Sequence, residues 1–313
     1  MTPLFNLQGH RGARGLKPEN TLPGFEVALD LGITSVETDI LLTSDGIPVI
    51  VHDWRLCKRI YRLIPGKSAP DPASEPRVRD LSLQQLRRYR ADGNRDESLF
   101  PKQNPSVTPL AKWFADQHGN DPYSPPTLAE LFQFVAAYAG EAGAAAGKNP
   151  AQQERARRFG LDLELKRVPF ESTIASDSFR PFFPGLLEEK VVEVVREANL
   201  VKRTTIRSFD HRSVLAVKQL EPRLQASVLV EGTAPVHPAR LARDAQAGTY
   251  CPEFRFLDEA QVRALHEEGI QVLPWTVNDP ESWQRLIDWG VDGITTDFPD
   301  QLARFLRDRH IDF

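Results

Sequence analysis

The chain has 313 residues, of which 41% are hydrophobic and 26% are charged, and its formal net charge is −4. This length suits either two domains or one α/β barrel, and the charge balance argues against a dedicated nucleic-acid-binding protein. The nearest thing to a basic patch is Lys58–Arg62, which is short enough to be an ordinary solvated surface. No apolar run reaches the ~18 residues of a membrane span, and the two cysteines lack the spacing of a disulfide scaffold or zinc site. The first residues lack signal-peptide features, so we expect a soluble cytoplasmic enzyme, or a periplasmic or secreted one if a leader peptide has been removed.

Short strand-like runs alternate with amphipathic helical runs along the chain. The expected strands cover residues 5–10, 36–42, 48–52, 161–166, 204–209, 224–230, 249–254, 271–277 and 293–296. The expected helices cover residues 22–31, 128–138, 186–198, 212–220, 259–268 and 280–290, followed by a last helix that contains Leu302, Phe305 and Leu306. Thr21 is a plausible N-cap of the first helix and Gly32 its stop signal. About eight strand–helix units in one chain predict an α/β fold of the TIM type, a (β/α)8 barrel, with a doubly wound sheet as the alternative.

Residues 55–126 interrupt this alternation. The segment contains ten prolines, no strand is expected in it, and only residues 81–89 look helical. An irregular segment of this length is either a functional insertion or partly disordered. Because it starts just after a strand that ends in a histidine, we expect an insertion that caps the active face of a barrel made of residues 1–54 and 127–313. The Ala/Gly-rich stretch 140–150 and the charged stretch after it are expected to be a mobile connection without chemistry.

Residues 161–166 alternate leucines with charged side chains, so Asp162, Glu164 and Lys166 share one face of a strand. A barrel strand points one face to the helices and the other to the interior, which places these charges inside. Because an unpaired buried charge is costly, they must pair, line the polar mouth of the barrel or hold a metal. A buried Glu164–Lys166 ion pair is the plainer alternative.

Glu37 and Asp39 lie two residues apart on another strand, so their carboxylates face the same way. Two like charges in a low-dielectric place need a cation, or one of them must stay protonated. With Glu164 on a nearby strand, three carboxylates could converge on one divalent cation. Ligation by oxygen alone suits Mg²⁺ or Ca²⁺ better than zinc. A solvated edge strand with incidental acids is the alternative.

His10 and His52 each end an expected strand, and Arg11 and Asp53 follow them. The carboxyl ends of barrel strands form the catalytic face, where one imidazole could act as base and the other as acid. The planar fork of Arg11 suits the oxygens of a phosphate. A salt bridge from Arg11 to one of the carboxylates is the alternative, and it is compatible with a phosphate role. The histidines to which we assign no chemistry are His118, His211, His237, His266 and His310.

Nine short motifs, in order along the chain, carry a resemblance to a known family. They are Gly9-His10-Arg11-Gly12-Ala13, Pro18-Glu19-Asn20-Thr21, Glu37-x-Asp39, Val51-His52-Asp53, Pro126-Thr127-Leu128, Glu164-Leu165-Lys166, Ser208-Phe209-Asp210, Trp275-Thr276-Val277-Asn278 and Asp292-Gly293-Ile294-Thr295-Thr296-Asp297. As a set they resemble the glycerophosphodiester phosphodiesterase family. The resemblance covers nearly the whole chain apart from the insertion, and it implies a TIM-type barrel that hydrolyses glycerophosphodiesters to glycerol 3-phosphate and an alcohol.

The resemblance also implies roles for single residues. They are His10 and His52 as the acid–base pair, Glu37, Asp39 and Glu164 as metal ligands, Arg11 and Lys166 as phosphate contacts, Trp275 near the glycerol moiety, and Asp297 as a weaker candidate at the polar rim. Trp275 could equally be barrel packing. Glu19 and Asn20 could position the first loop instead of touching substrate. The direction of Arg167 stays open, and the long insertion leaves the leaving-group preference open.

The expected chemistry is metal-dependent phosphodiester hydrolysis with a divalent cation, Mg²⁺ or Ca²⁺, and a small-molecule glycerophosphodiester as substrate; the oligomeric state stays open. The nucleophile is water or the neighbouring glycerol hydroxyl, which would give a transient cyclic phosphate. Two alternatives are a related barrel phosphodiesterase or lyase that forms a cyclic phosphate from lysophospholipids, and a non-catalytic barrel that binds glycerophosphodiesters. No nucleic-acid partner and no membrane span are expected.

Overall fold

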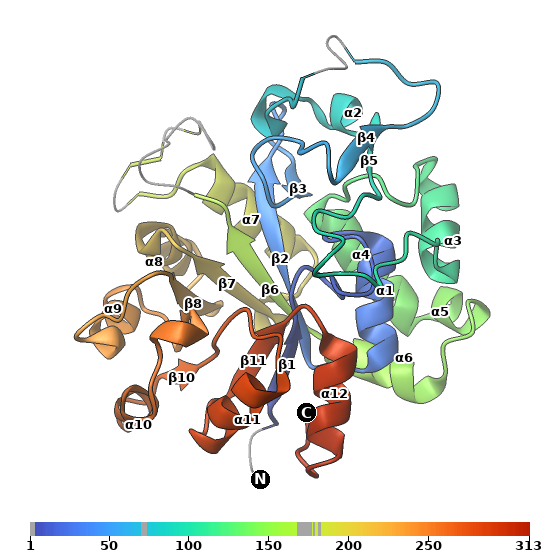
Figure 1. The fold of residues 1–313 in the computed structure, drawn as a ribbon. Helices are drawn as coiled ribbons and strands as arrows, with labels where there is room; N and C mark the ends of the chain where they lie inside the picture. The colour runs from blue at the N-terminus through green and yellow to red at the C-terminus, as the bar shows by residue number, and fades with distance from the viewer. Residues whose placement is uncertain (1–3, 70–73, 168–176, 178, 181–182) are drawn as a thin grey trace.

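The computed structural model describes residues 4–69, 74–167, 177, 179–180 and 183–313. Eight parallel strands form a nearly closed barrel, in the spatial order β10-β9-β8-β7-β6-β2-β1-β11 (Figure 1). Their bounds are β1 Asn6–Gly9, β2 Ser35–Leu42, β6 Gly160–Leu165, β7 Thr204–Ser208, β8 Gln225–Val230, β9 Thr249–Pro252, β10 Gln271–Val272 and β11 Gly293–Thr296. The expected TIM-type architecture is therefore confirmed.

Backbone hydrogen bonds close the seam between the segments of β10 and β11. The amide of Asp292 donates to the carbonyl of Val272, and the amide of Thr295 donates to that of Pro274, both at 3.0 Å. The amide of Val277 donates to the carbonyl of Thr295 at the same distance. Because β11 also pairs in parallel with β1, the first and last strands of the chain lie side by side.

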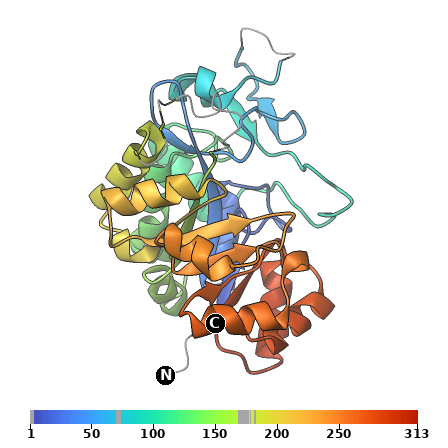
Figure 2. The ribbon, with the colours of Figure 1, turned by 90° about the vertical axis from the view of Figure 1, so that its left-hand side faces the viewer.

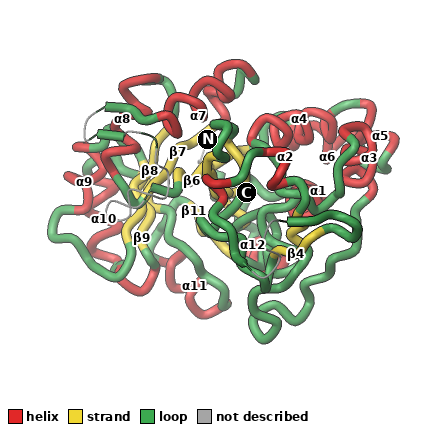
Figure 3. The backbone as a smooth tube through the Cα atoms, turned by 90° about the horizontal axis from the view of Figure 1, so that it is seen from above, coloured by secondary structure: helices red, strands yellow, loops and turns green. Residues whose placement is uncertain are grey.

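A helix follows each barrel strand. These helices are α1 Leu22–Leu31, α4 Leu128–Ala139, α7 Leu186–Glu197, α8 His211–Leu220, α9 Pro238–Asp244, α10 Glu259–Glu267, α11 Pro280–Asp288 and α12 Pro299–Arg307. Seen from above, α7 to α11 lie outside the strands they follow (Figure 3). The α1 helix begins and ends as expected, because the Thr21 side chain accepts from the Gly24 amide and Gly32 adopts φ 69°. None of the helices in the described part of the chain is long and apolar enough to cross a bilayer. The α9 helix had not been expected.

Side chains on β6 alternate between the two faces of the barrel wall as predicted. Leu161, Leu163 and Leu165 are buried in the main apolar core. Asp162 points the other way, where the Arg207 side chain of β7 donates to both its carboxylate oxygens. Of the roles open to it, Asp162 therefore forms a buried ion pair inside the barrel, below the mouth.

The strand β3 (Pro48–Ile50) is antiparallel to β2 and is not one of the barrel strands. The reason given for placing His52 at the catalytic face, the carboxyl end of a barrel strand, is therefore wrong. The hairpin instead folds back along β2, and the amide of Val51 donates to the carbonyl of Asp39 at 3.1 Å. Because the chain folds back in this way, His52 lies close to Asp39 along β2.

The proline-rich segment is more regular than expected. It contains an antiparallel pair, β4 (Tyr61–Leu63) and β5 (Tyr89–Ala91), a 3-10 turn over Val78–Asp80, and the helices α2 (Leu83–Leu86) and α3 (Pro109–His118). The expectation that this segment has no strand is therefore wrong. Of the helix expected over residues 81–89, only the part that forms α2 is helical. In both side views β4, β5 and α2 lie at one end of the molecule, and α11 and α12 lie toward the other (Figure 1, Figure 2).

The apolar side chains of the proline-rich segment belong to two separate clusters. One cluster joins the hairpin of β2 and β3 to the part around β4, α2 and β5, and it includes Leu41, Val49, Ile60 and Leu86. The α3 helix instead contributes to the main core of the barrel. The division into a barrel and an insertion over residues 55–126 stays a prediction.

The connection after α4 is also helical. It forms α5 (Glu141–Ala145) and α6 (Pro150–Ala156), and the side chain of Asn149 caps α6 by accepting from the Gln152 amide at 2.9 Å. The expectation of a mobile connection is therefore wrong. The Asn149-Pro150 pair is a helix-start signal that could have predicted α6.

Candidate active site

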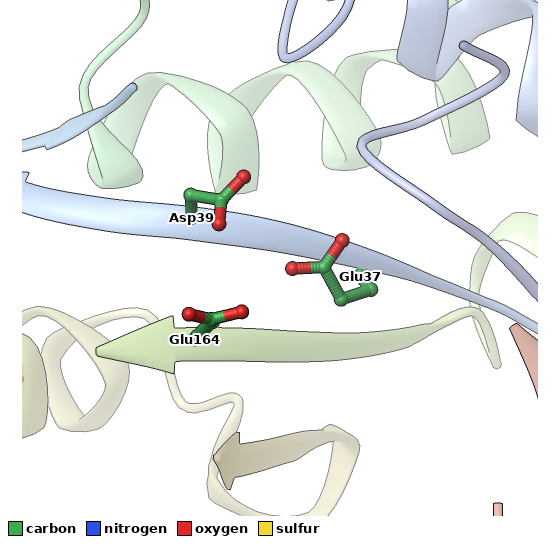
Figure 4. A group of neighbouring side chains, drawn as sticks. All are labelled: Glu37, Asp39 and Glu164. Carbon is green, nitrogen blue, oxygen red and sulfur yellow. The ribbon is translucent and has the colours of Figure 1, made fainter. Parts of the chain in front are cut away.

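Three carboxylates from two neighbouring strands meet at the mouth of the barrel. Glu37 and Asp39 come from β2, and Glu164 lies on β6 directly opposite Asp39 in the parallel register. One oxygen of each lies within 4.8 Å of the others, and all three residues are buried (Figure 4). The expected convergence of these acids is confirmed.

Burial and neighbouring charges set the ionisation of the acids in this cluster. Burial raises the pKa of Glu37 well above its usual range, and the nearby Asp39 and Glu164 raise it further. Burial also acts to raise the pKa of Asp39, but His52, Arg11 and Lys166 outweigh it, so that pKa is lowered. The cluster therefore combines an ionised carboxylate with one that resists ionisation.

Two carboxylate oxygens in this cluster are buried without a hydrogen-bond partner among the described residues, Oε1 of Glu37 and Oδ1 of Asp39. Buried acceptors normally have a donor, so such oxygens need an explanation. Hard divalent cations are bound by carboxylate oxygens. The donor set of Glu37, Asp39 and Glu164 therefore fits a divalent cation, and the cluster could hold one.

His10 follows β1 and is paired with a carboxylate from the other end of the chain. Its Nδ1 lies 2.7 Å from Oδ1 of Asp297, which follows β11. Asn278 donates to the second oxygen of Asp297 at 2.7 Å. The Nε2 atom of His10 is left on the side of Glu37, 3.9 Å from its Oε2. Burial lowers the pKa of His10, which favours the neutral ring.

His52 has a carboxylate partner of its own. Its Nδ1 lies 2.6 Å from Oδ1 of Asp53, and burial lowers the pKa of the ring. Arg95 in turn donates to Oδ2 of Asp53 at 2.5 Å. Sequence reasoning missed Arg95, because the residues around it carry no motif.

Arg11 and Lys166 are engaged with the acids of the site. Lys166 donates to Oε1 of Glu164 at 2.7 Å and lies 3.5 Å from Oδ1 of Asp39, so the Glu–Lys ion pair is present beside the cluster. Arg11 donates to Glu19 at 2.8 Å, lies 3.4 Å from Asp39, and its backbone amide donates to Glu37 at 3.1 Å. The salt-bridge alternative for Arg11 is therefore present as well.

The loop after β1 is shaped by backbone conformations that few residues adopt. Arg11 has φ 51°, and Gly12 follows with φ 90°. A Cβ atom on Gly12 would lie 3.0 Å from the backbone carbon of Gly24, so this position requires glycine. In the same loop Asn20 donates to Oδ2 of Asp39 at 2.8 Å, and Glu19 pairs with Arg11. Glu19 and Asn20 thus brace the loop and the cluster, as expected.

A cavity of about 790 Å³ opens above these groups. Its lining includes the titratable side chains His10, Arg11, Glu37, His52, Glu164 and Lys166. It also includes apolar side chains, among them Phe209, Leu229, Val230, Pro235 and Trp275, together with further polar ones such as His211 and Glu231. The cavity thus suits a ligand with an anionic end and a less polar end.

Trp275 is packed and also faces the cavity. Its Nε1 donates to the carbonyl of Cys251 at 2.9 Å, and the Phe209 ring meets it edge-on at 5.5 Å. Arg167 also lines the cavity, and its guanidinium pairs with Asp177 and Glu188. Phe209 had no assigned role, although its motif was recognised.

The sequence matches the model of the Glycerophosphoryl diester phosphodiesterase family over residues 10–301. It is similar to a glycerophosphodiester phosphodiesterase from Caldanaerobacter subterraneus, with 27% identity over 95% of this chain and 96% of the relative. A Bacillus altitudinis enzyme of the same name is 26% identical over 97% of this chain and 98% of its own.

Solved structures are consistent with this family match. A crystal structure from Silicibacter pomeroyi, assigned to the same family, has a TM-score of 0.79 and 27% identity, and covers 100% of this chain and 96% of that chain. The fold also matches an Oleispira antarctica phosphodiesterase in complex with the product sn-glycerol-3-phosphate, with a TM-score of 0.68 and 21% identity over 96% of each chain.

The fold and the matches define a hydrolase of the phosphodiesterase class built on a (β/α)8 barrel. The family match spans nearly the whole barrel and includes His10 and His52, which line the cavity. The chain belongs to the glycerophosphoryl diester phosphodiesterase family.

Proposed function

We propose that this protein hydrolyses glycerophosphodiesters to glycerol 3-phosphate and an alcohol, by acid–base catalysis with His10 and His52 and with the help of a divalent cation. One observation carries the proposal: two carboxylate-paired histidines and a cluster of three acids line or adjoin the same cavity. The product bound by the Oleispira antarctica relative supports the assignment of glycerol 3-phosphate.

The residues that would hold the cation are Glu37, Asp39 and Glu164, and Mg²⁺ or Ca²⁺ suits these oxygen donors. When bound, such a cation supplies Lewis-acid polarisation and neutralises charge on the phosphoryl oxygens. Arg11 and Lys166 add positive charge on the same side of the cavity. Together these groups favour binding of a phosphodiester anion and stabilise charge that grows in the transition state.

The two histidines divide the proton transfers between them. Because Nδ1 of each ring faces a carboxylate, the Nε2 atom of each is the one free to act. One Nε2 accepts the proton of the nucleophile as its oxygen bonds to phosphorus. The other ring, protonated at both nitrogens, donates its Nε2 proton to the alcohol oxygen as the bond between that oxygen and phosphorus breaks. Asp297 acts on His10 as a positioning residue, a role more specific than a place on the polar rim.

The Trp275 ring, which lines the cavity, offers a flat surface for the carbon chain of the glycerol moiety. The insertion over residues 55–126 would then shape the side of the alcohol. The contact of Arg95 with Asp53 supports an insertion that reaches the active face.

The test is to incubate the purified protein with glycerophosphocholine or glycerophosphoethanolamine, with and without Mg²⁺ or Ca²⁺, and to assay glycerol 3-phosphate. Metal-stimulated release of glycerol 3-phosphate supports the proposal. Phosphorus NMR follows the same reactions, and a cyclic phosphate that persists would favour the lyase alternative. Binding without turnover would overturn the enzymatic proposal in favour of a binding barrel.

A further inference from the structure

Arg95 comes from the proline-rich segment, yet it lies in the polar network behind the cavity. Its Nη2 donates to Oδ2 of Asp53 at 2.5 Å, and the other oxygen of Asp53 lies 2.6 Å from Nδ1 of His52. The same Nη2 lies 3.4 Å from Oε1 of Glu19. Arg95 therefore joins the partner of one histidine to the loop that carries the other.

The network continues from Glu19 to His10. Oε2 of Glu19 lies 2.9 Å from Nε of Arg14, and Nη1 of Arg14 lies 3.5 Å from Oδ1 of Asp297. The same Oδ1 lies 2.7 Å from Nδ1 of His10. Acidic and basic side chains alternate along this path, so the groups that hold the two imidazoles form one chain of ion pairs.

The loop that carries Arg95 is itself braced. Asn94 donates through its side chain to the carbonyl of Phe100 at 2.9 Å, and the Phe100 amide donates to the carbonyl of Asp96 at the same distance. The Phe100 ring lies 4.7 Å from the guanidinium carbon of Arg14. The loop thus presents Arg95 from a hydrogen-bonded backbone and also contacts the network at Arg14.

We propose that Arg95 is a positioning residue for catalysis, through which the insertion fixes the Asp53–His52 pair and couples it to the Asp297–His10 pair. This inference rests on the proposed function. A guanidinium suits the place because its several N–H donors can serve Asp53 and Glu19 together. Without it, Asp53 can turn toward solvent, and the ring of His52 loses its fixed orientation.

The experiment compares Arg95→Ala with Arg62→Ala, a control that removes the ion pair of another insertion arginine, the exposed Arg62, with Asp92. We expect Arg95→Ala to lower kcat for glycerophosphocholine by about 10- to 100-fold, the range for residues that orient an active group, with KM changed less than about threefold. Arg95→Lys and added guanidinium chloride at millimolar concentration should each restore part of the lost kcat. Arg62→Ala should keep wild-type kcat.

An unchanged kcat in folded Arg95→Ala, a loss confined to KM, or an equal loss in Arg62→Ala would overturn the inference. Should Arg95→Ala fail to fold, Arg95→Gln replaces it, because Gln removes the charge and keeps much of the side chain's length. Wild-type protein without glycerophosphodiester turnover would instead count against the proposed function.

A double-mutant cycle tests the coupling directly. If Arg95 acts through Asp53, Arg95→Ala combined with Asp53→Asn should lose no more kcat than the worse single variant. Losses that multiply would show that the two residues act independently, and would overturn the assignment of Arg95 as a support of Asp53.

Discussion

Asp39 on β2 and Glu164 on β6 are direct partners in the register of two neighbouring parallel strands. This pairing sets two carboxylates against each other, and the third, Glu37, lies one side-chain repeat away on β2. Their mutual repulsion in a buried place is a cost to the folded protein. A cation that removes this repulsion should therefore stabilise the fold as well as support catalysis.

Addition of Mg²⁺ or Ca²⁺ to EDTA-treated protein should raise its melting temperature, measured by differential scanning calorimetry. At a concentration 100 times the dissociation constant, the cation should add about 2.7 kcal/mol to the free energy of unfolding. Glu164→Gln should lose most of this effect, whereas Glu193→Gln on the exposed side of α7 should keep it. Full activity after exhaustive chelation would contradict the metal site.

Replacement of His10 or His52 by alanine should lower kcat by about 100-fold or more, because each ring carries one proton transfer. The measurement is the steady-state release of glycerol 3-phosphate. His310→Asn is a matched control, since this exposed histidine has φ 56°, a conformation that asparagine tolerates. Near-wild-type turnover in either alanine variant would remove that histidine from the mechanism.

The activity should persist to a pH below 6.5 before it falls. Burial lowers the pKa of both His10 and His52, so the ring that serves as base stays neutral in mildly acidic solution and is protonated only at lower pH. The measurement is the acid limb of kcat/KM against pH.

Two variants identify the base. Asp297 raises the pKa of His10, and the hydrogen bond that the His52 ring donates to Asp53 raises that of His52. The variant that removes the partner of the base, either Asp297→Asn or Asp53→Asn, should therefore move the acid limb to still lower pH. An acid limb above pH 6.5 in the wild-type protein would contradict the lowered pKa values of His10 and His52.

Cys251 should be inert in the folded protein. It is fully buried, and burial raises the pKa of its thiol to about 11, so almost none of it is thiolate at pH 8. Ellman's reagent should therefore not react with native Cys57→Ser protein, and should detect one thiol after denaturation. Rapid reaction of native Cys57→Ser protein would contradict this burial.

The Arg207–Asp162 pair should contribute to stability. Arg207→Met leaves the Asp162 carboxylate buried without its partner, which should lower the free energy of unfolding by about 3–5 kcal/mol. The double variant Arg207→Met with Asp162→Asn should recover part of the loss. Urea denaturation measures both. A loss below about 1 kcal/mol for the single variant would mean that Asp162 is not dependent on this pair.

Much of the barrel could be predicted because its helices carry their own boundaries. Thr21 and Gly32 place the ends of α1 by capping chemistry that acts within a few residues. The α5 helix escaped prediction because its Ala/Gly-rich sequence has no apolar periodicity. The α3 helix lies among prolines, although Pro109 stands at its first turn, where proline is tolerated.

All three members of the acid cluster could be predicted, but alternation alone does not distinguish Glu164 from Asp162. Alternation puts Asp162 and Glu164 on the same inward face of β6, yet only Glu164 reaches the cluster, because depth in the barrel depends on the register with β2 and β7. Arg95 could not be predicted at all. Its place depends on how the loop after β5 folds over the first loop, a tertiary contact with no local signal.

His10 and its partner Asp297 are separated by 287 positions along the polypeptide. During synthesis, the His10 imidazole is therefore not held until the segment that carries Asp297 has been translated. Fragments left by interrupted translation or by proteolytic removal of β11 and α12 would retain all three acids but lack the carboxylate that holds His10. We therefore expect turnover in a cell extract to come from molecules that contain both segments.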